Sequence, residues 1–241
     1  MGKLFLTGDI HMNLDIKKLS YKNFPESRDL TKDDIIVILG DAGLVWSGGK
    51  EEKYWQDWLK EKPWTTFCVL GNHECFKLIE QLPIVEFCGS PARQINNSLF
   101  YAESGFIYNL CGKFCLVVNG ADSTDKIFRI EGKSWWPQEQ ITEKDFLTAK
   151  ENLQFCNNKV DCLFTHTGGC AVARELGFNP TVSDEWVDKI MGLIQSPYQH
   201  FCGHYHINRF TSSGSRILYD DIILLSDSEQ NYENFWNAHN E

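Results

Sequence analysis

The stretch KLFLTGDIH, residues 3–11, sets the pattern on which the fold depends. It begins with a short run of apolar and β-branched residues, which is typical of a buried strand. Gly8 follows this run, and glycine lets a backbone turn tightly and approach a ligand closely. Asp9 and His11 come directly after it. The stretch therefore predicts a strand that presents metal-binding side chains just beyond its carboxyl end.

An apolar run followed by polar side chains of the metal-binding kind recurs four more times. GD follows the run at 34–39, GNHE the run at 65–70, H the run at 161–165, and GHYH follows HFC. These segments supply Asp41, Asn72, His73, Glu74, His166, His204 and His206. Because ligands in α/β folds bind where the carboxyl ends of strands meet, we expect these side chains to gather in one place.

Longer amphipathic stretches alternate with the apolar runs, and this alternation favours an α/β layer architecture. Further strands are predicted at 113–118 and 216–225, and a break of the second at Asp220–Asp221 is left open. The predicted helices are 50–60, 143–156 and 183–194. Ser183 is the predicted N-cap of the last helix. The chain has no internal repeat and no Gly/Ser-rich linker, so we expect a single domain over residues 1–241.

The composition limits the classes of partner. A net charge of −10 disfavours extended nucleic acid, because such binding depends on Lys and Arg that neutralise phosphates. No apolar run approaches the length of about 18 residues that crosses a bilayer, and the first run is too short for a signal peptide. The nine cysteines form no CxxC pair, so we expect reduced thiols in a cytoplasmic protein rather than a disulfide framework.

The donor types indicate transition-metal ions. Asp, Asn and His combine hard oxygen with borderline nitrogen donors, which suits Mn, Fe, Zn or Co better than an all-oxygen calcium site. The candidates are too many for one ion, and a pair of ions about 3.5–4 Å apart needs a bridging carboxylate. His204 and His206 would face the same way about 6.6 Å apart if their segment is extended. That spacing lets them serve two ions or converge on one.

In this order, the segments GDIH, GD, GNHE, FTHTGG and GHYH resemble the calcineurin-like metallophosphoesterases, and SWW after Arg129 resembles a feature of their small bacterial and phage-type members. The resemblance extends over residues 8–206. It implies an α/β fold that is a four-layer sandwich, with two mixed β-sheets packed face to face and flanked by helices. It also implies two metal sites, the first bound by Asp9, His11 and His206 and the second by Asn72, His166 and His204. Asp41 would bridge the two ions, and His73 would stand beside them.

The resemblance implies a two-metal-dependent hydrolase of phosphate esters, either a phosphomonoesterase or a phosphodiesterase of small or nucleotide-like substrates. The expected ions are Mn2+, with Fe, Zn, Co or Ni as alternatives. A hydroxide between them would attack phosphorus in line with the leaving group, and His73 would assist its departure. A nuclease of the same superfamily is one alternative, which the acidic charge disfavours. A non-catalytic scaffold is another, which the presence of His73 and all seven ligands disfavours.

The chain departs from the family pattern at two places. Leu44 stands where many members have an Asp or His that orients the catalytic histidine, so the partner of His73 is left open. Glu74 need not be that partner, because neighbours on an extended segment face apart. The arginines that follow GD and GNH in the protein Ser/Thr phosphatases are missing, which argues against that branch.

The segment IFRIEGKSWWPQEQ, residues 127–140, is the other unusual stretch. Arg129 or Lys133 is a candidate to bind a substrate phosphate. At least one residue of the pair Trp135–Trp136 is expected to pack into the core rather than stack on a ligand. The two remaining histidines, His200 and His239, are expected to be structural or on the surface.

Overall fold

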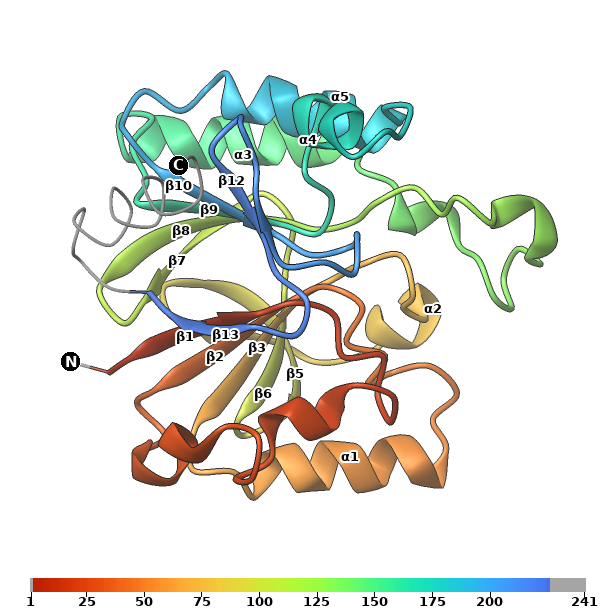
Figure 1. Cartoon of the computed structure of the whole chain (residues 1–241), viewed down its shortest axis with the longest axis vertical. Coiled ribbons are helices and arrows are strands. Elements are labelled where there is room, and N and C mark those ends of the chain that lie inside the picture. The colour runs from red at the N-terminus through yellow and green to blue at the C-terminus, as the bar shows by residue number, and fades with distance from the viewer. Residues whose placement is uncertain (1, 226–241) are drawn as a thin grey trace.

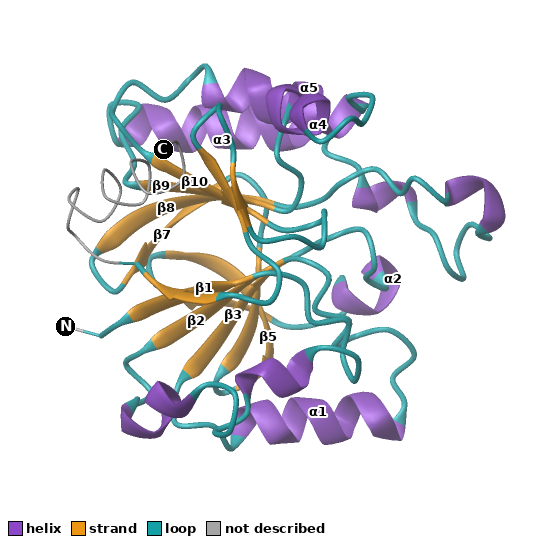
Figure 2. Cartoon of the chain, viewed as in Figure 1, coloured by secondary structure: helices purple, strands orange, loops and turns teal. Residues whose placement is uncertain are grey.

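The computed structural model describes residues 2–225, in which two mixed β-sheets face each other and helices cover their outer faces (Figures 1 and 2). The first sheet has the order β13-β1-β2-β3-β6-β5-β4, and the second has the order β11-β12-β10-β9-β8-β7. The architecture is the four-layer α/β sandwich that the family resemblance implies, so this prediction is confirmed.

The strands of the first sheet are β1 Leu4–Thr7, β2 Ile35–Leu39, β3 Thr65–Val69, β4 Ile84–Phe87, β5 Ser90–Asn96, β6 Leu99–Ala102 and β13 Ile222–Leu224. Those of the second are β7 Phe106–Leu110, β8 Lys113–Val118, β9 Cys162–Thr165, β10 Gln199–Cys202, β11 Arg209–Phe210 and β12 Ser215–Ile217. The helices are α1 Lys50–Lys60, α2 Phe76–Ile79, α3 Glu143–Phe155, α4 Cys170–Glu175 and α5 Val182–Met191. Short 3-10 helices lie at η1 Ile16–Leu19, η2 Pro25–Asp29, η3 Lys126–Phe128 and η4 Pro137–Glu139.

The central strands are apolar throughout because both of their faces are covered. In β2, Val37 and Leu39 join the cluster between the two sheets, together with Phe164 of the second sheet. Ile36 and Ile38 point the other way, into the cluster beneath the outer helices. This alternation follows from the two-residue period of a strand, and it explains why the sequence shows continuous apolar runs rather than alternating ones.

The parallel pairing brings distant segments of sequence together. β1, β2 and β3 are parallel neighbours in one sheet, and β8, β9, β10 and β12 are parallel neighbours in the other. Their carboxyl ends therefore meet at one side of the sandwich, at the right in Figure 1. The segment 122–140, drawn in green, projects from the same side.

Two sequence-based expectations need correction or refinement. Ser183 is not the N-cap of α5: the helix is capped by Thr181, which exchanges hydrogen bonds with Asp184, while the Ser183 hydroxyl accepts the N–H of Ile141. A Thr three residues before an Asp forms a capping box, and here Thr181 and Asp184 cap the helix two residues before Ser183. The run 216–225 is broken, and its halves, β12 and β13, belong to different sheets.

The cysteines and the helices bear on two further expectations, that the thiols are reduced and that no segment crosses a membrane. All nine cysteines are free thiols. Among residues 2–225, no helix combines the length and the apolar character that a bilayer-spanning segment needs. His239 lies outside the described residues.

His200 is a structural residue buried in β10. Its Nε2 lies 2.8 Å from the hydroxyl of Thr165, and its Nδ1 lies 2.8 Å from the hydroxyl of Ser215. The Thr165 hydroxyl donates to the carbonyl of Thr167, so it accepts from Nε2, and a neutral ring satisfies both contacts. Burial lowers the pKa of His200 to about 4.

This buried neutral histidine predicts acid sensitivity. Its folded pKa is lower than the ordinary value of 6.5, so between pH 6.5 and about 4 the unfolded chain takes up a proton that the folded chain does not. We expect the free energy of unfolding to be unaffected by this histidine above pH 6.5 and to fall by roughly 3 kcal/mol towards pH 4 because of it. In denaturant unfolding across this range, the free energy of unfolding should depend less on pH for His200→Gln than for the unchanged protein. Identical slopes in the two proteins would show that His200 is protonated in the folded state.

Candidate metal centre

The polar residues singled out in the sequence lie together at the carboxyl ends of five strands. Asp9 and His11 follow β1, Asp41 follows β2, and Asn72 and His73 follow β3 in the first sheet. The second sheet supplies His166, which follows β9, and His204 and His206, which follow β10. The site therefore bridges the two sheets.

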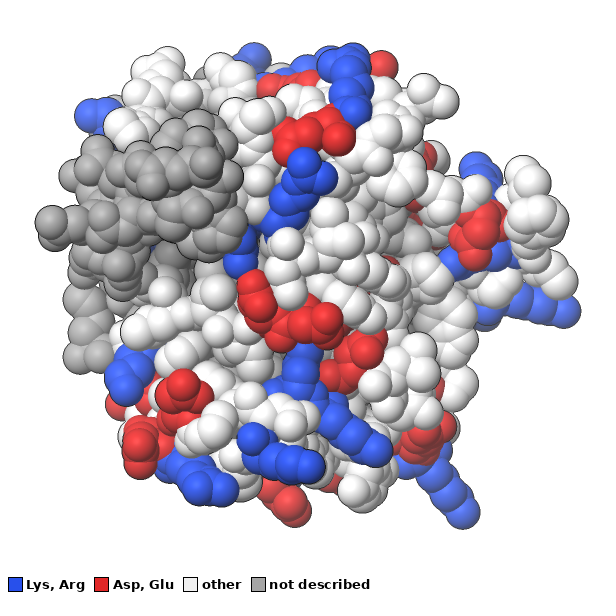
Figure 3. Space-filling view, in the orientation of Figure 1, with Lys and Arg blue, Asp and Glu red and all other residues white. Residues whose placement is uncertain are grey.

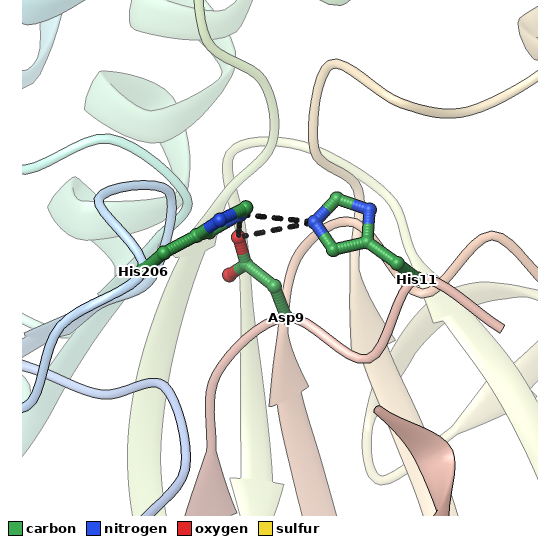
Figure 4. A group of neighbouring side chains, drawn as sticks. All are labelled: Asp9, His11 and His206. Carbon is green, nitrogen blue, oxygen red and sulfur yellow. Dashed lines mark hydrogen bonds and ion pairs between the residues drawn. The ribbon is translucent and has the colours of Figure 1, made fainter. Parts of the chain in front are cut away.

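Asp9 is the meeting point of one group of donors. It is fully buried, and its Oδ2 lies 3.1 Å from Nε2 of His206 and 3.8 Å from Nε2 of His11. The two Nε2 atoms are 3.0 Å apart. Figure 4 shows the three side chains pointing towards one another from opposite ends of the sequence. This spacing suits three ligands of one small cation.

Asp41 lies between this group and a second one. Its Oδ2 is 3.3 Å from Nε2 of His166 and 3.9 Å from Nε2 of His11. A single carboxylate oxygen is therefore close to both groups. The cluster Asp9, Asp41 and His166 has its ligand atoms within 4.8 Å of one another, as does the cluster Asp9, His11 and His206.

In both Asp9 and Asp41, one carboxylate oxygen accepts a backbone hydrogen bond and the other points towards the site. The Oδ1 of Asp9 accepts the backbone N–H of His204 at 3.0 Å, and the Oδ1 of Asp41 accepts that of His73 at 2.7 Å. The Oδ2 of Asp9 has no hydrogen bond of good geometry, although it is buried. An orphaned buried carboxylate oxygen is costly, and a bound cation would satisfy it.

His166 and Asn72 are oriented by the groups behind them. The Nδ1 of His166 donates to the carbonyl of Leu39 at 2.8 Å, which directs Nε2 towards the site. The Oδ1 of Asn72 lies 3.2 Å from that Nε2. The amide of Asn72 is turned this way because its Nδ2 donates to the hydroxyl of Ser123 at 3.1 Å. His204 completes this side, with its ring 4.9 Å from that of His166.

The backbone of the site has residues in the left-handed region and passes very close to the two carboxylates. Asp41, His204 and His206 have φ of 48°, 70° and 51°, in the left-handed region that non-glycine residues seldom adopt. A Cβ on Gly71 would lie 2.1 Å from Oδ1 of Asp41, and one on Gly203 would lie 2.3 Å from Oδ1 of Asp9. Such strain tends to persist where a site requires it.

The electrostatics of the centre keep the carboxylates ionised. Burial raises the pKa of Asp41, but the charge and hydrogen bond of His166 outweigh burial and hold that pKa below its ordinary value. The pKa of Asp9 is also lowered, again because His166 and His206 outweigh burial. Two buried negative charges with nitrogen and amide-oxygen donors around them form a set that fits divalent cations such as Mn2+, Fe2+ or Zn2+.

The partner of His73, which the sequence left open, is Arg129. The Nη2 of Arg129 lies 2.8 Å from Nε2 of His73. The guanidinium is also bound through Nε to the carboxylate of Asp125 at 2.7 Å and donates to the carbonyl of Ser134. Burial lowers the pKa of His73, and Arg129 lowers it further, whereas Asp41 opposes the change. The ring is therefore neutral at neutral pH.

Glu74 faces away from His73 and is not its partner. It is fully buried and accepts the N–H groups of Ala42 and Gly43, and its other oxygen accepts the hydroxyl of Tyr101. Burial and the nearby charge of Asp41 raise its pKa to about 8. Its role is to hold the turn that carries Asp41.

The segment 127–140 is anchored by its tryptophans. Trp135 and Trp136 are both buried, and Trp136 packs edge-on against Trp46 at 5.2 Å. The expectation that at least one of the pair belongs to the core is confirmed. Lys133 is exposed on the same segment, so of the two basic candidates only Arg129 is in contact with the cluster.

Sequence reasoning missed the residues that support the ligands. Ser123 follows the strand β8, and Tyr219 follows β12, which is parallel to β10. The rule that found the ligands, a polar side chain after a parallel strand, also applies to both positions. Tyr219 was missed because it lies inside the strand predicted at 216–225, before the possible break at Asp220–Asp221. Lys18 carries no signal in the sequence.

Comparisons with known proteins identify the family of this chain. A search of curated proteins finds no match. A solved structure of a protein of unknown function, AQ665 from Aquifex aeolicus, is 14% identical over 79% of this chain and 94% of that one, with a TM-score of 0.30, which supports no conclusion about the site. The family model for calcineurin-like phosphoesterases matches residues 2–225. Because that match covers nearly the whole chain, the protein belongs to the calcineurin-like phosphoesterase family.

Proposed function

We propose that this chain hydrolyses phosphate esters with two divalent cations. The ligands of the first would be Asp9, His11 and His206, and those of the second would be Asn72, His166 and His204, with Asp41 between them. The observation that carries the proposal is the position of Asp41, whose Oδ2 lies within 4 Å of nitrogen donors from both groups. Family membership supports hydrolysis of phosphate esters as the reaction class.

Manganese is the proposed native metal, with Fe, Zn, Co and Ni as alternatives, because the donors mix carboxylate, amide oxygen and imidazole. Bound cations would lower the pKa of a water molecule and offset the charge that develops on the phosphoryl oxygens. The residues of the chain hold the ligand atoms in place beforehand, through the backbone N–H groups on Asp9 and Asp41 and the carbonyl of Leu39 on His166.

His73 and Arg129 would act on the substrate itself. Because burial keeps the pKa of His73 low, the neutral ring would donate a hydrogen bond to the leaving oxygen and steady its charge. Arg129, already 2.8 Å from that ring, would grip the phosphoryl oxygens with its remaining donors. Lys133 remains a candidate for a second phosphate contact from the exposed part of the segment.

We propose small or nucleotide-like monoesters or diesters as substrates. Acidic and basic side chains are interspersed over the face shown in Figure 3, rather than gathered into one basic surface. Together with the net charge of −10, this disfavours extended nucleic acid as a substrate on that face. A compact phosphate ester needs no such surface, because the cations and Arg129 would supply the positive charge.

Arg129→Gln tests the substrate contact. We expect kcat/KM to fall roughly 10- to 150-fold, because a charged hydrogen bond to phosphate contributes about 1.5–3 kcal/mol. Metal content should not change, since no proposed ligand contacts Arg129. Arg28→Gln, at an exposed position in η2, is the matched control and should behave as the unchanged protein. Equal kcat/KM for Arg129→Gln and the control would remove Arg129 from the site.

The proposal as a whole is tested by metal content and by hydrolysis of two chromogenic esters. We expect p-nitrophenyl phosphate, bis-p-nitrophenyl phosphate or both to be hydrolysed when Mn2+ is added to protein that has been stripped with a chelator. The stripped protein should be inactive. A stripped protein that hydrolyses either ester at the full rate, or a manganese-loaded protein that hydrolyses neither, would contradict the proposal.

A further inference from the structure

Tyr219 lies against the most exposed of the proposed ligands. Its ring stacks on that of His206, with centroids 4.7 Å apart and planes at 11°. The side chain of His206 is 48% exposed, whereas Asp9 beside it is fully buried. The backbone of His206 is also in the left-handed region, with φ of 51°. A histidine in this position needs support from one face, and Tyr219 covers that face.

Tyr219 is itself held at both ends. Its hydroxyl donates to the carboxylate of Asp15 at 3.1 Å. Its carbonyl accepts a hydrogen bond from the ammonium group of the half-buried Lys18, which lies 5.4 Å from the centre of the Tyr219 ring. Asp15 and Lys18 come from the segment that follows β1, so Tyr219 is fixed to the start of the chain.

The same lysine fixes the partner of His206. The ammonium group of Lys18 donates to the carbonyl of Asp9 at 2.8 Å and to that of Gly8 at 3.1 Å. Three carbonyls thus use all three of its donors. One half-buried side chain therefore sets the position of the backbone at Asp9 relative to the backbone at Tyr219. The side chains of Asp9 and His206, which approach to 3.1 Å, depend on that relation.

We infer that Tyr219 is a positioning residue, which holds the imidazole of His206 at the first metal site by stacking on it and is itself anchored by Asp15 and Lys18. The inference rests on the proposed function, since it assigns His206 to a cation. Groups that orient metal ligands typically change metal affinity about 10- to 100-fold when they are removed. Stacking, rather than a hydrogen bond, is the means here, because the contact lies on the ring face.

Calorimetric titration of metal-free protein with Mn2+ tests the inference. For Tyr219→Leu we expect one of the two binding events to weaken at least tenfold and the other to be retained. Tyr219→Phe and Asp15→Ala each remove only the hydroxyl anchor, so each should lose no more than about threefold. Tyr54→Leu makes the same change at an exposed tyrosine of α1 and should match the unchanged protein.

A second measurement needs no metal. In the metal-free protein the stacked tyrosine ring should shift the NMR signals of the His206 ring protons upfield, and Tyr219→Leu should abolish that shift while Tyr219→Phe keeps it. Equal manganese affinities in Tyr219→Leu and Tyr54→Leu would overturn the inference, as would an equal loss in Tyr219→Phe and Tyr219→Leu. Failure of the unchanged protein to bind Mn2+ would instead overturn the proposed function, and this inference with it.

Discussion

Replacing Asp41 with alanine is expected to abolish hydrolysis and to weaken binding of both cations. Its Oδ2 lies 3.9 Å from Nε2 of His11 and 3.3 Å from Nε2 of His166, so its removal takes a carboxylate oxygen from both groups. Loss of the metal pair removes several kcal/mol of stabilisation from the transition state, which corresponds to at least about a thousandfold in kcat/KM.

The measurement combines metal analysis with hydrolysis of p-nitrophenyl phosphate and its diester. Asp57→Ala is the matched control, because Asp57 is exposed on α1 and its ion pair with Lys53 is a surface contact. The control should keep full metal content and full activity. A variant Asp41→Ala that retains two tightly bound cations would show that Asp41 is not the shared ligand.

Replacing His73 with alanine is expected to leave metal binding intact and to lower kcat about 100- to 10,000-fold. The metal should remain because the hydrogen bond that His73 donates to Asp41 comes from its backbone N–H, which alanine also has. The turnover should fall because the imidazole, placed between Asp41 and Arg129, would no longer steady the leaving oxygen.

Leaving groups of different basicity sharpen this prediction. If His73 acts on the leaving oxygen, His73→Ala should lose most with a poor leaving group such as an alkyl phosphate and least with p-nitrophenol, which departs without help. A uniform loss over all leaving groups would assign His73 to substrate binding instead. Normal turnover with alkyl esters would remove the role altogether.

The main features of the fold and of the site could be predicted because they depend on strand ends. A buried parallel strand must be apolar, and a side chain just beyond its carboxyl end lies at the edge where neighbouring strands also end. Runs such as KLFLT and DIIVIL therefore indicated both the sheet and the place of Asp9 and Asp41. The structure brings eight of the nine polar residues singled out at these ends into one region, whereas Glu74 faces away from it.

The antiparallel part of the first sheet could not be predicted in the same way. β4 has one exposed or half-buried position after another, and β5 contains a proline and a bulge near Gln94. Neither has the continuous apolar run that marks the central strands. β4 is the edge strand and pairs with β5, which in turn pairs with β6, and local sequence does not record these contacts.

The contacts that tune the site are also invisible in the sequence. Arg129 and His73 are 56 positions apart, and Lys18 and Tyr219 are 201 apart. Leu44 stands where the family resemblance would place a polar partner for His73, and it is buried in the cluster beneath the outer helices. The imidazole of His73 is contacted instead by Arg129, from a different segment. Only the folded arrangement of that segment identifies Arg129 as the partner.

The most direct test is the anomalous difference density of manganese in crystals of the protein grown with Mn2+. We predict two peaks about 3.5–4 Å apart with Asp41 between them. One should lie against Asp9, His11 and His206, and the other against Asn72, His166 and His204. A single peak, peaks away from Asp41, or no peak at a manganese concentration that supports hydrolysis would contradict the two-cation centre.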